Sequence, residues 1–159
     1  MKFEPLAVGA VVDEVVKGCT VEADARQCRI VVRKEITRGL TGHPELLRRA
    51  VENVLRNAIR YAPRDTDVTV EAVDSSSGIT IAVRDRGQGV PDADLPRLTQ
   101  PFFRVNEARD SASGGIGLGL SIASRAVRLH HGSLAVENAH PGLRVSIVLP
   151  ESVGYQAAS

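Results

Sequence analysis

The chain has 159 residues, of which 43% are hydrophobic and 25% charged, and its formal net charge is +1. This length fits a single domain of ordinary globular composition, and the near-zero charge excludes a broad basic field for nucleic acid or an acidic tail. With no tryptophan, three phenylalanines and two tyrosines, the chain also lacks the aromatic residues of a base-stacking platform.

Two cysteines, Cys19 and Cys28, occur without a CxxC spacing. We interpret them as reduced thiols, because a disulfide framework or a zinc site needs more ligands. No apolar run reaches the ~18 residues of a membrane span, and the start lacks a signal-peptide pattern. The sequence therefore predicts a soluble chain, and it leaves open whether this chain is part of a longer protein.

Hydrophobic spacing predicts the first elements of the chain. Valines recur at helical intervals over residues 8–16, and residues 29–36 are rich in the β-branched side chains typical of a strand. The strongest helix signal covers residues 44–62, where Pro44 suits the first turn and Pro63 ends the helix. The apolar stripe of this helix predicts one buried face.

The middle of the chain combines a hairpin with a long loop. Residues 68–73 and 79–83 alternate between apolar and polar side chains and are joined by a turn-rich link, which predicts two paired strands. Residues 84–117 are rich in Gly, Pro, Ser and Asp and show no periodicity. A structureless stretch of that length inside a compact domain is typical of a functional loop.

The last elements complete a fold prediction. A helix is predicted at residues 118–131, followed by a hairpin of strands at residues 134–137 and 143–148. Helices that cover one face of a mixed, mainly antiparallel sheet make an α+β two-layer sandwich. We expect this domain to span residues 1–152, and residues 153–159 to form a loose C-terminal tail.

Two asparagines and an arginine share one face of the long helix. Asn53 and Asn57 lie four residues apart, and Arg60 follows three residues later. Mg²⁺ prefers oxygen ligands and completes its shell with water and substrate phosphates, so neutral amide oxygens suit it when a triphosphate brings the negative charge. Arg60 is placed to meet phosphate oxygens. The alternative is that all three are exposed polar residues of an amphipathic helix.

Asp85 follows the second strand of the first hairpin and precedes Gly87 and Gly89. A buried carboxylate there can accept a hydrogen bond from the exocyclic amine of adenine, which guanine does not present at that position. Glycines let the backbone approach a flat ring closely and adopt positive φ. The alternative is a plain Asp-x-Gly turn after a strand.

A glycine-rich run at residues 115–120 opens the next helix. Amides at a helix N-terminus present N–H groups and a partial positive charge to phosphate. The run is neither a Rossmann fingerprint, since no strand leads directly into it, nor a P-loop, since no GK[ST] follows. Ser111, Ser113 and Gly114 just before it suit a mobile lid. The alternative is a flexible loop that caps a helix.

In this order, the motifs resemble those of the catalytic and ATP-binding domain of bacterial sensor histidine kinases, in the wider group that includes DNA gyrase and MutL. The long helix resembles the N box, residues 85–89 the G1 box, residues 101–104 the F box and residues 115–120 the G2 box. The resemblance covers residues 5–150 and is closest to the CpxA-like branch. It implies the Bergerat ATP-binding fold, with about three helices on one face of the sheet and an ATP lid.

The resemblance also implies a role for each site residue. Asn57 would bind Mg²⁺ with support from Asn53, and Asn57 would act in catalysis with Arg60 and Arg104, which would neutralise phosphate charge. Tyr61 would pack on the nucleotide and Asp85 would bind the adenine amine. The remaining positions expected to contact the nucleotide or to form the lid are Gly87, Gly89, Val90, Phe103, Gly115, Ile116, Gly117, Leu118, Gly119 and Leu120. Ile116 stands where many family members have threonine.

One position separates kinases from hydrolases in this group. The gyrase-like ATPases, and the serine kinases that restrain sigma factors, carry a glutamate base four residues before the metal-binding asparagine. Here that position is Asn53, whose amide cannot accept a proton. Glu52 is about 100° round the helix and is expected to face elsewhere. The sequence therefore favours transfer to a histidine, which brings its own base, over an anti-sigma serine kinase.

The phosphoacceptor is expected on another domain, because none of the four histidines fits the pattern H-[ED]-x-x-[TN]-P. His43 comes closest, but it lies only ten residues before Asn53, too near for a helical domain to intervene. His131 resembles a helix-ending histidine of the family, and His140 lies in a turn.

The expected partners are therefore ATP, a phosphoacceptor helical hairpin of the parent kinase and a downstream response regulator. We expect the chain to be a monomeric cytoplasmic domain, with the parent an inner-membrane sensor. It would make no contact of its own with membrane or nucleic acid. A degenerate nucleotide-sensing docking module remains an alternative.

Overall fold

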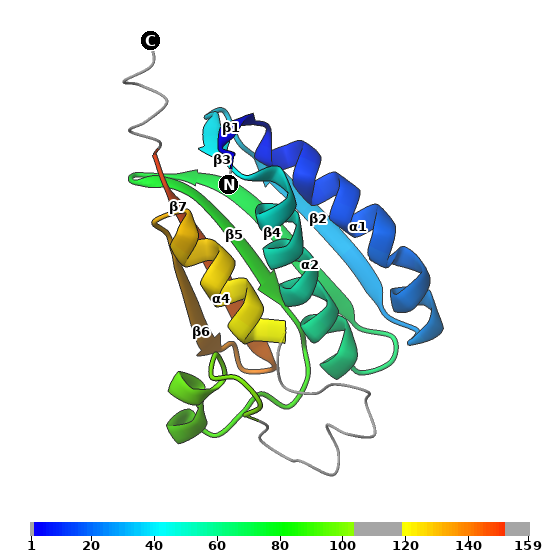
Figure 1. Ribbon diagram of the computed structural model, residues 1–159. Coiled ribbons are helices and arrows are strands. Elements are labelled where there is room, and N and C mark those ends of the chain that lie inside the picture. The colour runs from blue at the N-terminus through cyan, green and yellow to red at the C-terminus, as the bar shows by residue number, and fades with distance from the viewer. Residues whose placement is uncertain (1, 104–118, 152–159) are drawn as a thin grey trace.

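The computed structural model describes residues 2–103 and 119–151. Helices lie on one face of a twisted sheet, and a small second sheet lies near the N-terminus (Figure 1). The elements in chain order are β1 (Glu4–Leu6), α1 (Val8–Ala25), β2 (Arg29–Glu35), β3 (Leu40–Gly42), α2 (Pro44–Tyr61), β4 (Asp67–Ser75), β5 (Gly78–Arg84), the 3₁₀ helix η1 (Asp92–Arg97), α4 (Gly119–Leu129), β6 (Ser133–Asn138) and β7 (Leu143–Pro150).

The main sheet has five strands in the order β2-β4-β5-β7-β6. β2 and β4 are parallel, whereas β4–β5, β5–β7 and β6–β7 are antiparallel. α1, α2 and α4 cover one face of this sheet (Figure 1). The predicted α+β two-layer sandwich with a mixed, mainly antiparallel sheet is confirmed.

The core lies between the helices and the sheet. β4 and β5 bury alternate side chains, as period-two strands with one covered face require. From α2, the stripe predicted by its hydrophobic spacing supplies buried residues: Leu47, Ala50, Val51, Val54, Leu55, Ala58 and Ile59. This packing fixes the rotation of α2 about its axis and therefore decides where its polar face points.

Four elements differ from the prediction: α1, β1, β3 and η1. α1 continues to Ala25, well beyond residue 16, because Cys19 and Ala23 extend the buried stripe of Val8, Val12 and Val15. The sheet of β1 and β3 was not predicted, because strands of three residues carry too little periodicity. The expected structureless loop contains η1, with Pro96 inside it.

A pair of histidines ties the start of α2 to the end of α4. His43 is the N-cap of α2, and its Nδ1 accepts a hydrogen bond from the Leu46 N–H at 3.2 Å. The His43 backbone N–H donates to Nε2 of the buried His130 at 3.0 Å, and the other ring nitrogen of His130 lies 2.7 Å from the Ala126 carbonyl. Hydrogen bonds therefore join the two helices at the N-terminal end of α2 and the C-terminal end of α4. The opposite ends, where α2 ends and α4 begins, lie beside the predicted site.

Within residues 2–103 and 119–151, no helix combines the length and the apolar character needed to cross a bilayer.

Candidate functional site

Parts of three predicted motifs meet at the end of the sheet where β5 ends, α2 ends and α4 begins (Figure 1): the polar face of α2, the loop after β5 and, from the glycine-rich run, Gly119 and Leu120. A Cβ atom on Gly119 would lie 3.9 Å from the Asn53 Oδ1, so the start of α4 adjoins the polar face of α2. A Cβ atom on Gly87 would lie 2.6 Å from the Tyr61 carbonyl oxygen, so the loop after β5 passes directly under the end of α2. Of the predicted site, Arg104, Gly115, Ile116, Gly117 and Leu118 lie outside the described residues.

The polar face of α2 presents amide oxygens without competing partners. Asn53 donates its Nδ2 to the Arg49 carbonyl at 2.9 Å, which leaves Oδ1 toward Gly119. Within residues 2–103 and 119–151, the half-buried Asn57 amide has no hydrogen-bond partner, and the Arg60 guanidinium makes no ion pair. These oxygen donors and this cation are therefore available to a ligand.

Glu52 faces away from this surface, as its position on the helix predicts. Its two carboxylate oxygens are held by Arg48 at 2.5 Å and Arg56 at 3.0 Å, the residues four before and four after it. A carboxylate engaged by two guanidinium groups on another face cannot serve as a base beside Asn57.

Asp85 is a buried carboxylate with one oxygen committed. Its side chain is 3% exposed. Oδ1 accepts the Gly87 N–H at 2.8 Å and the Leu143 N–H at 3.4 Å, whereas no described group hydrogen bonds to Oδ2. Burial raises the pKa of the Asp85 carboxyl above its usual value, although the two backbone amides oppose the shift. The site thus holds a fixed acceptor in a poorly solvated place.

The loop after Asp85 is held by residues that the motif analysis missed. Gly89 has φ +70, and a Cβ atom there would lie 2.6 Å from the Asn138 Oδ1. Gly142 has φ +86, and its Cβ atom would fall 1.9 Å from the Asp85 carbonyl oxygen. The turn between β6 and β7 therefore packs closely against residues 85–90, which we call the G1 loop. The sequence signals that Gly142 lies in a tight turn. That this turn contacts the loop after Asp85 follows from the order β5-β7-β6 in the sheet, which no local pattern predicts.

Of the phenylalanine motif, Pro101, Phe102 and Phe103 are described, and they follow η1. Phe103 is half-buried, and its N–H donates to the Gln100 carbonyl at 3.3 Å. Phe102 adopts φ 65 and is 71% exposed, while Leu95 and Leu98 of the preceding segment pack against the core. Val90 and Leu120, two other predicted contacts, also lie in or against the core beside the site.

The histidines outside the site have structural partners. His43 caps α2 and His130 accepts the His43 amide, as described above. His131 takes φ 60 where α4 ends, and a Cβ atom on Gly132 would lie 2.3 Å from the Val148 carbonyl oxygen. These positions are turn and cap positions, and that none of them is a phosphoacceptor stays a prediction.

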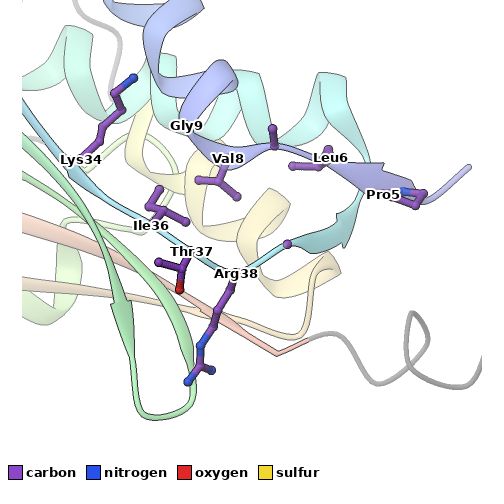
Figure 2. Close-up of a pocket in the computed structure, with 10 residues that line it drawn as sticks. Pro5, Leu6, Val8, Gly9, Lys34, Ile36, Thr37 and Arg38 are labelled. Carbon is purple, nitrogen blue, oxygen red and sulfur yellow. The ribbon is translucent and has the colours of Figure 1, made fainter. Parts of the chain in front are cut away.

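A separate hollow of about 630 Å³ lies between the start of α1 and the chain that follows β2 (Figure 2). Its lining includes Leu6, Val8, Ile36 and Thr37, and the side chains of Lys34 and Arg38 extend in different directions (Figure 2). Lys34 is paired with Asp13. This hollow contains none of the predicted site residues.

Comparison with known proteins agrees with the motif pattern. Residues 42–153 match the family described as histidine kinase-, DNA gyrase B-, and HSP90-like ATPase. The sensor histidine kinase CpxA of Escherichia coli K12 is 44% identical over 112 residues, which are 70% of this chain and 24% of CpxA. The chain thus spans about a quarter of the length of that relative.

Solved structures agree as well. The mycobacterial sensor histidine kinase MprB superposes with a TM-score of 0.82 at 28% identity, over 94% of this chain and 97% of that chain. Full-length ShkA in complex with AMPPNP superposes with a TM-score of 0.81 at 22% identity, over 94% of this chain and 31% of ShkA, which speaks for the fold alone. The chain belongs to the histidine kinase-, DNA gyrase B-, and HSP90-like ATPase family, and its similar proteins are sensor histidine kinases.

Proposed function

We propose that the chain binds ATP with Mg²⁺ at the site framed by α2, α4 and the loop after β5. The γ-phosphoryl group then passes to a histidine on a separate helical hairpin. The observation that supports this most directly is Asp85, a buried carboxylate with no described hydrogen-bond partner on its Oδ2, in the loop that passes under the end of α2. ShkA, which has the same fold, is described as a complex with AMPPNP, and this supports a nucleotide as the ligand.

Asp85 is the proposed adenine anchor. Its Oδ2 has no described partner and can accept a hydrogen bond from the exocyclic amine, while Oδ1 is held by Gly87. Such a bond is strong because the acceptor is ionised and poorly solvated. Guanine presents a carbonyl oxygen at the corresponding position, which a carboxylate repels. This arrangement therefore selects adenine.

The polar face of α2 is the proposed phosphate and metal side of the site. The Asn57 and Asn53 amide oxygens fit the oxygen preference of Mg²⁺, and their neutrality suits a metal that also binds a triphosphate. When bound, Mg²⁺ supplies charge neutralisation on the phosphates. Arg60, with Arg104 of the lid, would hold phosphate oxygens, and the first amides of α4 would add a partial positive charge. Tyr61 would pack on the nucleotide.

The chain itself provides positioning and leaves the nucleophile to its partner. Phosphoryl transfer depends chiefly on alignment and charge stabilisation. The unprotonated imidazole nitrogen attacks with its own lone pair, and the proton on the other ring nitrogen passes to a base of the hairpin or to solvent, so this chain need not supply a base. The bond from the bridging oxygen to the γ-phosphorus breaks, ADP leaves, and a nitrogen–phosphorus bond forms. In a parent sensor kinase the phosphoryl group would pass on to an aspartate of a response regulator, with this domain on the cytoplasmic side of the membrane.

Glu52→Gln tests the absence of a base on α2. We expect transfer within about twofold of the unmodified chain, because Glu52 is bound to Arg48 and Arg56 and not to the site. In an anti-sigma serine kinase, loss of the essential glutamate near the metal asparagine would reduce transfer by orders of magnitude. A large loss in Glu52→Gln would therefore favour that rival. The measurement is the initial rate of phosphoryl transfer.

Titration of the purified chain with ATP, with and without Mg²⁺, and with GTP, tests the proposed function. We expect binding that Mg²⁺ strengthens and that prefers ATP over GTP. Addition of a separately supplied helical hairpin with an acceptor histidine should then yield acid-labile phosphohistidine on the hairpin and none on this chain. No binding of either nucleotide would contradict the proposal and favour the docking-module alternative. Phosphohistidine on the isolated chain would contradict the separate acceptor.

A further inference from the structure

The end of the β6–β7 hairpin holds both ends of the G1 loop. Asn138 and Leu143 are cross-strand partners that close this hairpin. Leu143 fixes the start of the loop, since its carbonyl accepts the Asp85 N–H at 3.1 Å and its own N–H reaches the Asp85 Oδ1 at 3.4 Å. Asn138 fixes the end of the loop at Val90. One pair of residues therefore spans the whole segment that carries the carboxylate.

The Asn138 side chain uses both of its polar atoms on this loop. Its Oδ1 accepts the Val90 N–H at 3.0 Å, and its Nδ2 donates to the Val90 carbonyl at 2.7 Å and to the Asp92 Oδ1 at 2.9 Å. The amide thus pairs with Val90 in the way that a neighbouring strand would. Gly89 is needed for this approach, because a Cβ atom there would lie 2.6 Å from Asn138 Oδ1.

We propose that Asn138 is a positioning residue of the nucleotide site, which fixes the exit of the G1 loop so that the Asp85 Oδ2 stays aimed at adenine. This role rests on the ATP-binding function proposed above. Between the two fixed ends lies Gly87, whose N–H holds the Asp85 Oδ1. Release of Val90 frees Gly87 to move, and the carboxylate loses its fixed orientation. In this role Asn138 acts through the loop that carries Asp85, since its side-chain hydrogen bonds go to Val90 and Asp92.

A double-mutant cycle between Asn138→Ala and Asp85→Asn tests this coupling. In the unmodified background we expect Asn138→Ala to weaken ATP binding about tenfold, the size expected for loss of a set of partly buried hydrogen bonds. In the Asp85→Asn background the same change should cost less than about twofold, because there is no longer an adenine contact to misplace. Equal losses in the two backgrounds would overturn the proposal, since a general structural role is additive.

Two further measurements make the test specific. Inorganic triphosphate, which has no base, should bind Asn138→Ala as it binds the unmodified chain, whereas ATP should not. Glu137→Gln is the matched control, because Glu137 precedes Asn138 on β6 and pairs with Arg144 instead of the loop. It should leave the affinity for ATP unchanged. A parallel loss of triphosphate binding in Asn138→Ala would contradict a role confined to the adenine side.

Asn138→Asp covers the case in which the alanine variant does not fold. This change is isosteric and puts a carboxylate oxygen where Nδ2 meets the Val90 carbonyl and the Asp92 carboxylate. We expect a loss of ATP affinity at least as large as that of alanine, partly restored by Asp92→Asn. Unchanged affinity in Asn138→Asp would overturn the proposal. If the unmodified chain fails to bind ATP, the proposed function itself is wrong, a result distinct from either outcome.

Discussion

Asn57→Ala is expected to abolish phosphoryl transfer and to remove the effect of Mg²⁺ on ATP binding. The Asn57 amide is half-buried on the polar face of α2 and has no partner among the described residues. In the proposed site, loss of this oxygen would leave Mg²⁺ without its main protein ligand, and the phosphates would lose the alignment that transfer needs. We expect the rate of transfer to fall at least about 100-fold, the order found when one electrostatic contact to a reacting group is deleted.

The measurement pairs ATP titrations at several Mg²⁺ concentrations with transfer to the supplied hairpin. Asn57→Asp is the informative companion, because a carboxylate can still ligate Mg²⁺, and it should retain part of the Mg²⁺ dependence. Thermal unfolding serves as the control for folding: alanine is the better helix former, so stability should stay equal or rise by about 0.5 kcal/mol. Mg²⁺-assisted binding and transfer that survive in a folded Asn57→Ala chain would rule out this role.

The long elements of the fold were predictable because their patterns are local. α2 has a proline at its start, a proline after its end and a continuous apolar stripe. The strands of both hairpins alternate with period two because one face is covered and the other is not. The second half of α1 was missed because Gly18 and the polar residues around it favour no helix on their own. Burial of Cys19 and Ala23 against the core overrides that local preference.

In the candidate site, too, residues with a local sequence signal could be predicted, and residues brought together only by the fold could not. Asn53 and Asn57 could be identified because helical spacing puts them on one face, and Asp85 because it stands between a strand and two glycines. Asn138 could not be identified, since it reaches Val90 across 48 residues and only the order β5-β7-β6 brings them together. The fold and the family are confirmed. The roles of the individual site residues, the lid and the domain boundary at residue 152 stay predictions.

Asp85→Asn is expected to weaken ATP binding at least about tenfold while the chain stays folded. The asparagine oxygen can keep the hydrogen bonds from Gly87 and Leu143, so the loop retains its anchor. At the position of Oδ2, however, an amide group would present N–H donors to the exocyclic amine of adenine. The N–H groups of the variant amide and of the adenine amine would then face each other, and neither would have an acceptor in this poorly solvated place. This accounts for the expected loss of ATP affinity.

The preference of Asp85→Asn for ATP over GTP distinguishes a lost adenine contact from a general distortion of the site. An amide N–H can donate to the carbonyl oxygen that guanine presents, so the preference for ATP over GTP should narrow in Asp85→Asn. The measurement is a pair of titrations, with Glu52→Gln as the variant expected to keep the original preference. Near-normal ATP affinity, or an equal loss for both nucleotides, would show that Asp85 does not read the base.

In the nucleotide-free chain, Asp85→Asn is expected to increase the stability of the fold, although it decreases the affinity for ATP. Burial raises the pKa of Asp85, so the folded state binds its proton more tightly than the unfolded state does. The ionised carboxylate therefore costs stability at neutral pH, and this cost is absent below the usual pKa of about 4 and grows as pH rises through the raised value. Asparagine never ionises, so Asp85→Asn should be the more stable of the two proteins at neutral pH.

Urea unfolding of the nucleotide-free proteins across this pH range measures the difference directly. The stability advantage of Asp85→Asn should be full above the raised pKa and should shrink toward zero as the pH falls to about 4, where wild-type Asp85 is itself protonated. A variant that is less stable than wild type at neutral pH would mean that the carboxylate charge holds the loop together. If Asp85→Asn is more stable but binds ATP more weakly, the buried carboxylate destabilises the nucleotide-free fold, and its contact with adenine offsets this destabilisation only when ATP is bound.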